Sequence, residues 1–316
     1  MKKYAVVMTC TTNLIKCLNT AINGLNAYGN DVDIHVLGFP LPKEYLANLP
    51  DNCICPPTDP LIDADKPNTK PWHVRFIRYK YAGTLSGYDA VAILDADCLV
   101  IDNIMEHFEM AAQTGKLILP YNTRGWTLGK IDSAEGRGLH VQSAVTPPYH
   151  CHPFFFDPKK YKWLMDEVYE WGGKEPFGDM ATLFRTLYRH NMHRDVHALP
   201  GQLYVFTDWY FDMIRYSQDA SGAPCLNLDA RISTNFESGS RMKVIHRRWA
   251  LPPIRAAYMF GKGKCTPGPL HINNMEAMMK AIKWFDENGS AKWAPYVDPK
   301  YVLEWNTYEN YDAYKK

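Results

Sequence analysis

The sequence predicts an α/β fold, with a mixed, mostly parallel central sheet and flanking helices. Two observations support this fold class. An apolar strand from Tyr4 to Met8 precedes a helical pattern, and a second strand follows from Val32 to Phe39. An acidic strand occurs later in the chain, again between two helical patterns. Strand–helix–strand units favour parallel sheets, since the helix returns the chain to the end at which the next strand starts.

The first unit is marked by its periodicity and its turn residues. Apolar residues recur at helical spacing between residues 14 and 25, and Gly29 is suited to end that helix. The first strand ends in Thr9-Cys10-Thr11-Thr12. Because ligands bind at the carboxyl ends of strands in open parallel sheets, these threonines are predicted to lie at a ligand site.

A basic helix is predicted next. Residues 50–71 are rich in proline and irregular, which indicates a surface loop. The segment from Trp72 to Leu85 predicts a helix on which Arg75 and Arg78 share a face at i, i+3. These cations precede an acidic strand, so they are candidates for contacting the phosphates of a nucleotide. The alternative is a helix face that is simply solvated.

The acidic strand organises the chain. An apolar run from Ala90 to Leu94 leads directly into Asp95-Ala96-Asp97, and apolar residues resume at Leu99. Two carboxylates at the end of a buried strand are costly unless a cation compensates them. Side chains at i and i+2 of a strand point the same way, so one divalent cation with a preference for oxygen is predicted to bind both. In the alternative, one Asp caps the following turn and the other is solvated.

The middle of the chain is less regular. A helix is predicted over Asn103–Gln113 and a strand over Lys116–Tyr121. Residues 122–149 are polar, rich in glycine and aperiodic, and loops of that length are usually functional or disordered. His150 and His152 have a spacing that suits metal binding, but no third ligand is nearby. We therefore interpret them as ordinary strand residues.

Three further helices are predicted from Asp157 onward. One opens at Asp157-Pro158, and another opens near Asp179, which is suited to act as its N-cap. A short strand is predicted over Lys243–Ile245. Residues 252–269 form a basic, glycine-containing loop, and a last helix is predicted over Met275–Phe285.

Composition sets broad limits on the class of protein. The 316 residues are 46% hydrophobic and 22% charged, which is ordinary for a soluble globular protein, and the formal net charge is +1. This net charge by itself demands no polyanionic partner. The eight cysteines show no zinc-site spacing, and we recognise no signal peptide and no apolar run that would span a bilayer. A reducing, cytoplasmic location is therefore the expectation.

These features together resemble nucleotide-sugar-dependent glycosyltransferases of the GT-A fold, a Rossmann-like arrangement. The resemblance is strongest to the glycogenin/galactosyltransferase-like group, which carries Y-L-D-A-D-x-L-V. It rests on residues 88–100, YDAVAILDADCLV, and extends in kind over most of residues 1–250. It implies a nucleotide-sugar-binding half over 1–120, an acceptor-side half of the same domain over 121–250, and a basic loop, helix and tail over 251–316.

The resemblance also implies a set of donor-binding groups. Mn²⁺ or Mg²⁺ would be bound by Asp95 and Asp97 and would bridge to the diphosphate of a nucleotide sugar, with a UDP-sugar favoured. His246, which follows a predicted strand, stands where the family supplies a further metal ligand. Ordinary readings of His246 are a core histidine or a turn residue.

One departure from the family pattern affects phosphate binding. The usual H-x-x-G-x-x-K-P-W is replaced here by His246-Arg247-Arg248-Trp249. Guanidinium groups match phosphate geometry, so Arg247 and Arg248 are candidates for clamping the diphosphate, as are Lys262 and Lys264 of the glycine-containing loop.

The remaining implied roles concern the nucleoside and the acceptor. If the resemblance holds, Thr9, Thr11 and Thr12 would contact the nucleoside. An inverting enzyme needs a carboxylate base for the acceptor hydroxyl, for which Asp179 is the first candidate and Glu175 the second. In a retaining enzyme Asp179 would instead position the sugar or the acceptor. The sequence does not choose between the two stereochemical courses.

The acceptor and the wider class have alternatives. Saccharides and proteins are candidate acceptors, and so is a modified DNA base as in viral DNA glycosylation, which would place the chain in a host cytoplasm and require base flipping. A nucleotidyltransferase is an alternative class, but its glycine-rich loop is missing after the first strand. A non-catalytic sugar-nucleotide-binding protein is the third interpretation.

Overall fold

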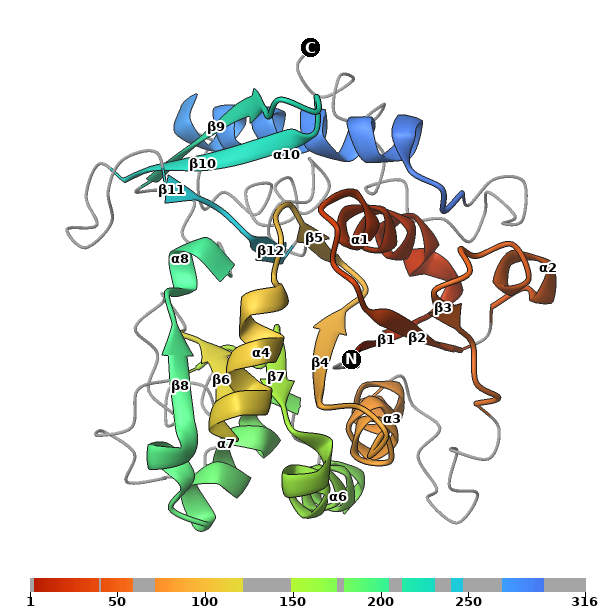
Figure 1. The fold of residues 1–316 in the computed structure, drawn as a ribbon, viewed down its shortest axis with the longest axis vertical. Coiled ribbons are helices and arrows are strands. Elements are labelled where there is room, and N and C mark those ends of the chain that lie inside the picture. The colour runs from red at the N-terminus through yellow and green to blue at the C-terminus, as the bar shows by residue number, and fades with distance from the viewer. Residues whose placement is uncertain are drawn as a thin grey trace, which may run out of the picture.

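The computed structural model describes residues 3–39, 41–58, 72–121, 149–174, 179–204, 212–230, 240–246 and 269–292 (Figure 1). Its centre is a seven-stranded sheet in the order β3-β2-β1-β4-β7-β6-β8. The strands are β1 Tyr4–Cys10, β2 Asp33–Gly38, β3 Cys53–Ile54, β4 Ala90–Asp95, β6 Leu117–Pro120, β7 Phe154–Phe156 and β8 Val196–Leu199. Among the described pairings of this sheet, only those of β7 are antiparallel.

Both faces of the sheet are buried, which explains the nearly continuous apolar strands. Alternate residues of β1 go to opposite faces: Val6 and Met8 belong to one core cluster, and Ala5 and Val7 belong to the other. The first face is covered by α1 (Ile15–Ala27) and α4 (Met105–Thr114). The second face is covered by α3 (Trp72–Gly83), α6 (Pro158–Lys174) and α7 (Asp179–Arg189).

A second group of strands lies beside the carboxyl end of the sheet (Figure 1). The strands β9 (Asp212–Gln218), β10 (Pro224–Ala230) and β11 (Ser240–Arg241) form an antiparallel sheet. The long helix α10 (Pro269–Asn288) packs against it in a third apolar cluster. A two-stranded ribbon of β5 (Cys98–Val100) and β12 (Val244–His246) joins this group to the central sheet.

Short elements complete the described chain. They are the helices α2 (Lys43–Leu46) and α8 (Gly201–Tyr204) and two 3₁₀ turns over Thr12–Leu14 and Met192–Asp195. The described cysteines are all free thiols, and five of the seven are buried. No helix within the described ranges is long and apolar enough to cross a membrane.

The predicted fold class is confirmed, including the parallel first unit. Gly29 has a positive φ of 63° directly after α1, as expected of a residue that ends a helix. The predicted last helix is present, but it begins at Pro269 rather than Met275. The segment predicted as an irregular loop over 50–71 contains the short strand β3, which pairs with β2. His150 and His152 lie in the loop before β7 rather than in a strand.

Candidate metal site and the adjoining ion-pair cluster

The acidic turn lies at the carboxyl edge of the central sheet. Asp95 is the last residue of β4 and is paired in register with Thr9 of β1, so the two predicted ligand-site segments lie side by side. After the turn at Ala96-Asp97 the chain continues into β5, whose Cys98 is in register with His246 of β12. Antiparallel pairing therefore places His246 next to the two aspartates, although 150 residues separate them in sequence.

Three side chains converge at this turn. His246 Nε2 lies 3.0 Å from Asp95 Oδ2 and 3.1 Å from Asp97 Oδ1. Ligand atoms in adjacent positions around an octahedral ion with bonds of about 2.1 Å are about 3 Å apart. The spacing of the His246 nitrogen to each carboxylate oxygen fits such an ion, and two oxygens with one imidazole nitrogen form a donor set that suits a first-row divalent metal.

The electrostatics of these three side chains reflect the same convergence. Burial lowers the pKa of His246, but Asp97 and Asp95 outweigh burial and raise it to about 10. Burial raises the pKa of Asp95, but the nearby Arg78 and His246 hold it well below its ordinary value. His246 therefore carries a proton at neutral pH in the position where a divalent cation would replace it. Its Nδ1 has no hydrogen-bond partner among the described residues.

A second ionic cluster adjoins this site and is centred on Arg78. This side chain is 1% exposed and uses two different nitrogens: Nη1 pairs with Asp95 Oδ1, and Nη2 pairs with Asp179 Oδ2. Asp95 thus belongs to both clusters, with one oxygen facing Arg78 and the other facing His246. Asp179 Oδ1 accepts a hydrogen bond from the Met180 backbone N–H at 3.0 Å, at the start of α7.

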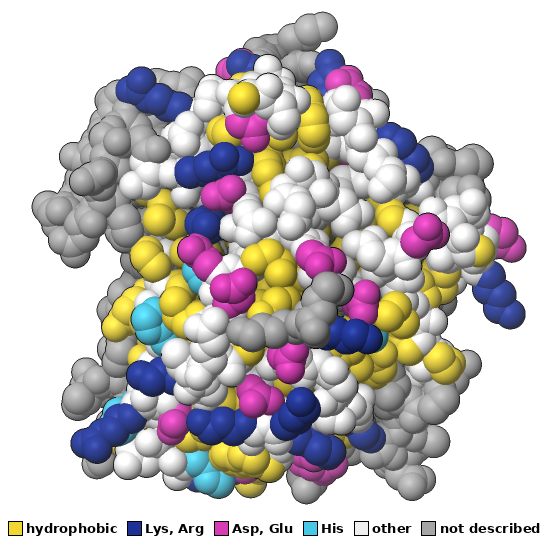
Figure 2. Space-filling model, viewed as in Figure 1, with side chains coloured by type: hydrophobic (Ala, Val, Ile, Leu, Met, Phe, Trp, Pro, Cys, Tyr) yellow, Lys and Arg dark blue, Asp and Glu magenta, His cyan; other side chains and the backbone are white. Residues whose placement is uncertain are grey.

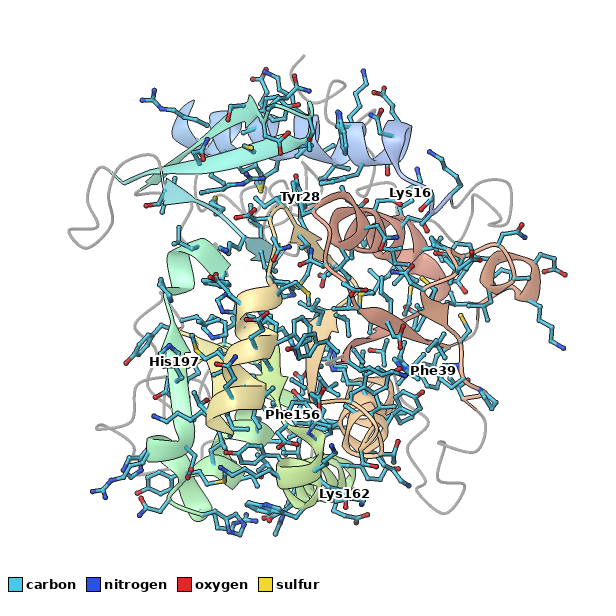
Figure 3. The ribbon with its side chains drawn as sticks, viewed as in Figure 1. Lys16, Tyr28, Phe39, Phe156, Lys162 and His197 are labelled. Carbon is cyan, nitrogen blue, oxygen red and sulfur yellow. The ribbon has the colours of Figure 1, made fainter. Side chains whose placement is uncertain are left out.

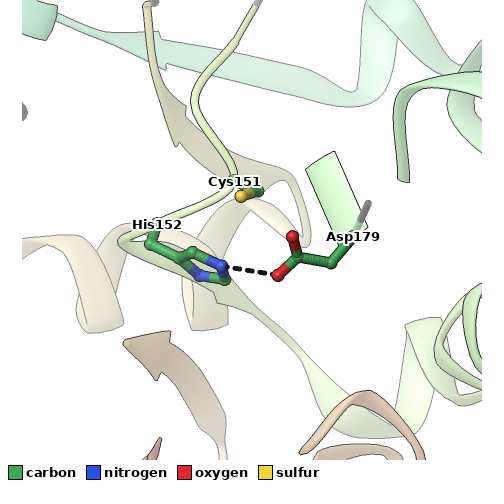
Figure 4. Close-up of side chains that lie close together, drawn as sticks. All are labelled: Cys151, His152 and Asp179. Atoms are coloured by element: carbon green, nitrogen blue, oxygen red, sulfur yellow. Dashed lines mark hydrogen bonds and ion pairs between the residues drawn. The ribbon is translucent and has the colours of Figure 1, made fainter. Parts of the chain in front are cut away.

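His152 completes the second cluster. Its Nε2 lies 2.6 Å from Arg78 Nη2. The same nitrogen lies 3.2 Å from Asp179 Oδ2 (Figure 4). Cys151, His152 and Asp179 form a buried group with the geometry of metal ligands. Because Arg78 Nη2 contacts both His152 and Asp179, we assign the cation of this group to the guanidinium rather than to a metal.

His150 lies between the two clusters. Its ring packs edge-on against His246, with ring centroids 5.3 Å apart, and its Nδ1 lies 3.0 Å from the His152 carbonyl oxygen. Burial, with the neighbouring His246, lowers the pKa of His150 to about 3. The interpretation of His150 and His152 as ordinary strand residues was therefore wrong. The H-x-H spacing was a signal for the site, although neither ring belongs to the Asp95–Asp97–His246 group.

Asp179 is held in its ionised form. Burial raises its pKa, but Arg78 and the contact with His152 outweigh burial and hold the pKa well below the ordinary range. The carboxylates of Asp95 and Asp179 raise the pKa of Arg78 and outweigh the lowering effect of its burial. The pair is therefore fully charged at neutral pH.

The other predicted site residues have different outcomes. Thr9 is buried at the end of β1, and Thr11 and Thr12 follow it at the same edge, partly exposed. Arg75 and Arg78 both lie in α3, where Arg75 is exposed and Arg78 is buried, and the contact of Arg75 with phosphate stays a prediction. The remaining candidates lie outside the described residues, and these are Glu175, Arg247, Arg248, Lys262 and Lys264.

The face of the molecule that Figure 2 displays carries charges of both signs. Lysine and arginine side chains are interspersed with aspartate and glutamate side chains there. Side chains fill the space on both sides of the sheet, with Phe156 of β7 inside the molecule (Figure 3).

No protein-family model matches the chain, and no curated protein matches its sequence. Several solved structures are similar. The galactosyltransferase LgtC, in complex with donor and acceptor sugar analogs, matches with a TM-score of 0.43 and 15% identity over 64% of this chain and 75% of its own. The glycosyltransferase GlyE of Streptococcus pneumoniae matches with a TM-score of 0.44 and 18% identity, over 64% of this chain and 46% of its own.

Mouse xyloside xylosyltransferase 1 is similar over more of the chain. It matches with a TM-score of 0.47 and 11% identity, over 77% of this chain and 97% of its own. These three similar structures are a galactosyltransferase, a glycosyltransferase and a xylosyltransferase.

Proposed function

We propose that the chain is a metal-dependent glycosyltransferase that moves a sugar from a nucleoside-diphosphate sugar to an acceptor hydroxyl. The observation that supports this most is the convergence of Asp95, Asp97 and His246 at the carboxyl edge of a parallel sheet. Two carboxylates and a histidine at that edge suit a divalent ion that binds an anionic ligand. Thr9, Thr11 and Thr12 at the neighbouring strand end are proposed to contact the nucleoside.

The chemistry of such a transfer matches what these residues supply. Breaking the bond between sugar and phosphate develops negative charge on the departing diphosphate, and a divalent ion bound at the aspartates would stabilise that charge. Asp95 and Asp97 would hold the ion with His246 in its neutral form. We favour Mn²⁺ or Mg²⁺ as the ion and a UDP-sugar as the donor.

Asp179 is proposed to orient the reacting sugar or acceptor. A general base works best when its pKa lies near the working pH. The ion pair with Arg78 keeps the pKa of Asp179 far below that range, so in this arrangement its carboxylate is a weak base and a fixed negative charge. This supports the positioning role that a retaining course requires over the role of general base. Saccharides, proteins and modified DNA bases all stay candidate acceptors.

A thermal-shift panel of nucleotide sugars, with and without Mn²⁺, tests the proposal. A ligand that binds only the folded state raises the melting temperature, by an amount that grows with ligand concentration over Kd. We expect UDP or a UDP-sugar to stabilise the protein only when Mn²⁺ is present. If no nucleotide diphosphate or nucleotide sugar stabilises the protein with Mn²⁺, or with Mg²⁺ in a parallel panel, the proposal is wrong.

The double variant Asp95→Asn/Asp97→Asn tests which residues are responsible. It should lose Mn²⁺-dependent hydrolysis of the donor, since amides are poor ligands for the ion and leave His246 alone. Asp166→Asn is the matched control, because the Asp166 side chain is 43% exposed and pairs with Lys162 on the surface of α6. Donor hydrolysis that survives in the double variant at the wild-type rate would exclude this metal site.

A further inference from the structure

We infer that Arg78 couples the metal site to Asp179, as a positioning residue that two carboxylates share. This inference rests on the proposed metal site and goes beyond it, since Asp179 is not a ligand of that site. The guanidinium joins Asp95 on one nitrogen to Asp179 on the other. Asp95 in turn presents its second oxygen to His246. One continuous chain of ionic contacts therefore runs from the metal ligands to Asp179.

The cluster has two hydrogen-bonding arrangements, which is what coupling requires. His152 Nε2 is within hydrogen-bonding distance of both Arg78 Nη2 and Asp179 Oδ2. The Nε2 of a neutral imidazole either accepts from the guanidinium or donates to the carboxylate, but not both. His152 Nδ1 and Arg78 Nε have no partner among the described residues, so no other contact there fixes the choice. Arg78 can therefore be held more by Asp95 or more by Asp179.

A metal ion changes this balance. An ion bound to Asp95 Oδ2 weakens the electrostatic attraction between Asp95 and Arg78. The guanidinium therefore interacts more strongly with Asp179. In the opposite direction, removing the charge of Asp179 leaves Arg78 paired with Asp95 alone among the carboxylates of the described residues. Arg78 then competes with the ion for Asp95. Coupling of this kind is reciprocal by thermodynamic necessity. Asp179 is thus fixed in its working position when the ion is in place.

The affinity for Mn²⁺, measured by electron paramagnetic resonance of the free ion, tests this coupling without a substrate. Asp179→Asn should weaken Mn²⁺ binding about tenfold, which is within the usual range of coupling between sites. Asp166→Asn removes a carboxylate of the exposed surface and should change the affinity less than about twofold.

A double-mutant cycle separates coupling through Arg78 from the direct electrostatic effect that loss of the Asp179 charge has on the ion. Arg78→Lys keeps the positive charge, but one ammonium cannot occupy the places of two guanidinium nitrogens. In that background we expect Asp179→Asn to weaken Mn²⁺ binding by less than about threefold. An equal loss in both backgrounds, or no loss in either, would overturn the inference.

Two further observations keep the test decisive. Circular dichroism and the melting temperature establish that each variant is folded. If Arg78→Lys does not fold, guanidinium ¹⁵N resonances of the wild-type protein replace it: those of the buried Arg78 should move when Mg²⁺ saturates the site, and unmoved resonances would overturn the coupling. A wild-type protein that binds no Mn²⁺ would overturn both the proposed metal site and this inference, whereas normal Mn²⁺ binding without coupling overturns the inference alone.

Discussion

The protonated His246 makes the affinity for a metal depend on pH. Two carboxylates raise its pKa to about 10, and a metal ligand has to be neutral, so binding releases a proton from this ring at neutral pH. The same shift stabilises the metal-free fold fully below pH 6.5, the ordinary pKa of histidine, and that contribution is lost as the pH rises through about 10.

We therefore predict that Mn²⁺ affinity increases about tenfold per pH unit between pH 7 and pH 9, as one released proton requires. Isothermal titration calorimetry in buffers of different ionisation enthalpy would count the proton. His246→Gln should bind more weakly and lose this dependence on pH. An affinity that is flat over this range would show that His246 does not change its protonation on binding.

At the scale of elements, the site depends on how closely α1 approaches β5, the strand that follows the acidic turn. A Cβ on Gly24 of α1 would lie 2.2 Å from the backbone oxygen of Val100. Real Cβ atoms do not approach a backbone atom so closely, and no change of side-chain rotamer relieves the overlap. Glycine at this position lets the helix lie directly on the β5–β12 ribbon.

Gly24→Ala should therefore destabilise the protein by about 1–3 kcal/mol, the usual cost of overpacking, despite the better helix propensity of alanine. Urea denaturation measures this difference. Gly87→Ala is the matched control, because a Cβ there meets no atom of the described residues within 4 Å and its φ is not in the left-handed region. The control should be neutral or slightly stabilising, and equal effects of the two changes would contradict the packing argument.

At the scale of the whole molecule, Asn23 ties the central sheet to the group formed by β9, β10 and α10. Its buried side-chain amide donates to the carbonyls of Phe285 and Ala291, each at 3.1 Å, and its oxygen accepts from the Ala291 N–H at 2.8 Å. Buried backbone groups at the end of α10 are thus satisfied by a side chain of α1.

Asn23→Leu should lower the free energy of unfolding by about 2–4 kcal/mol. Each buried donor or acceptor that is left without a partner costs about 1–3 kcal/mol. Hydrogen exchange should become faster in α10 while α6 keeps its protection. Asn288→Ala, which removes an exposed contact to the Trp284 carbonyl near the same end of α10, should change stability by less than about 0.5 kcal/mol. Uniform acceleration across the molecule would show that the two parts unfold as one.

The sequence by itself determined the fold class, most strands and helices of the central sheet, and the place of the acidic turn. These follow from local rules: apolar periodicity, glycine at a helix end, and carboxylates at the end of a buried strand. The position of His246 beside them was predicted only through a family resemblance, and its distances to Asp95 and Asp97 agree with a shared ion.

Only the tertiary structure decided what Arg78 does. Helical spacing placed it on one face with Arg75 as a contact for phosphate, but a buried guanidinium needs anions, and Asp95 and Asp179 are 17 and 101 residues away in sequence. Likewise, His152 contacts Arg78 of α3 and Asp179 of α7, and His150 packs against His246 of β12. The spacing of the two histidines in the sequence does not reveal these contacts. Charge pairing in the interior depends on which elements pack together, and that is a property of the whole chain.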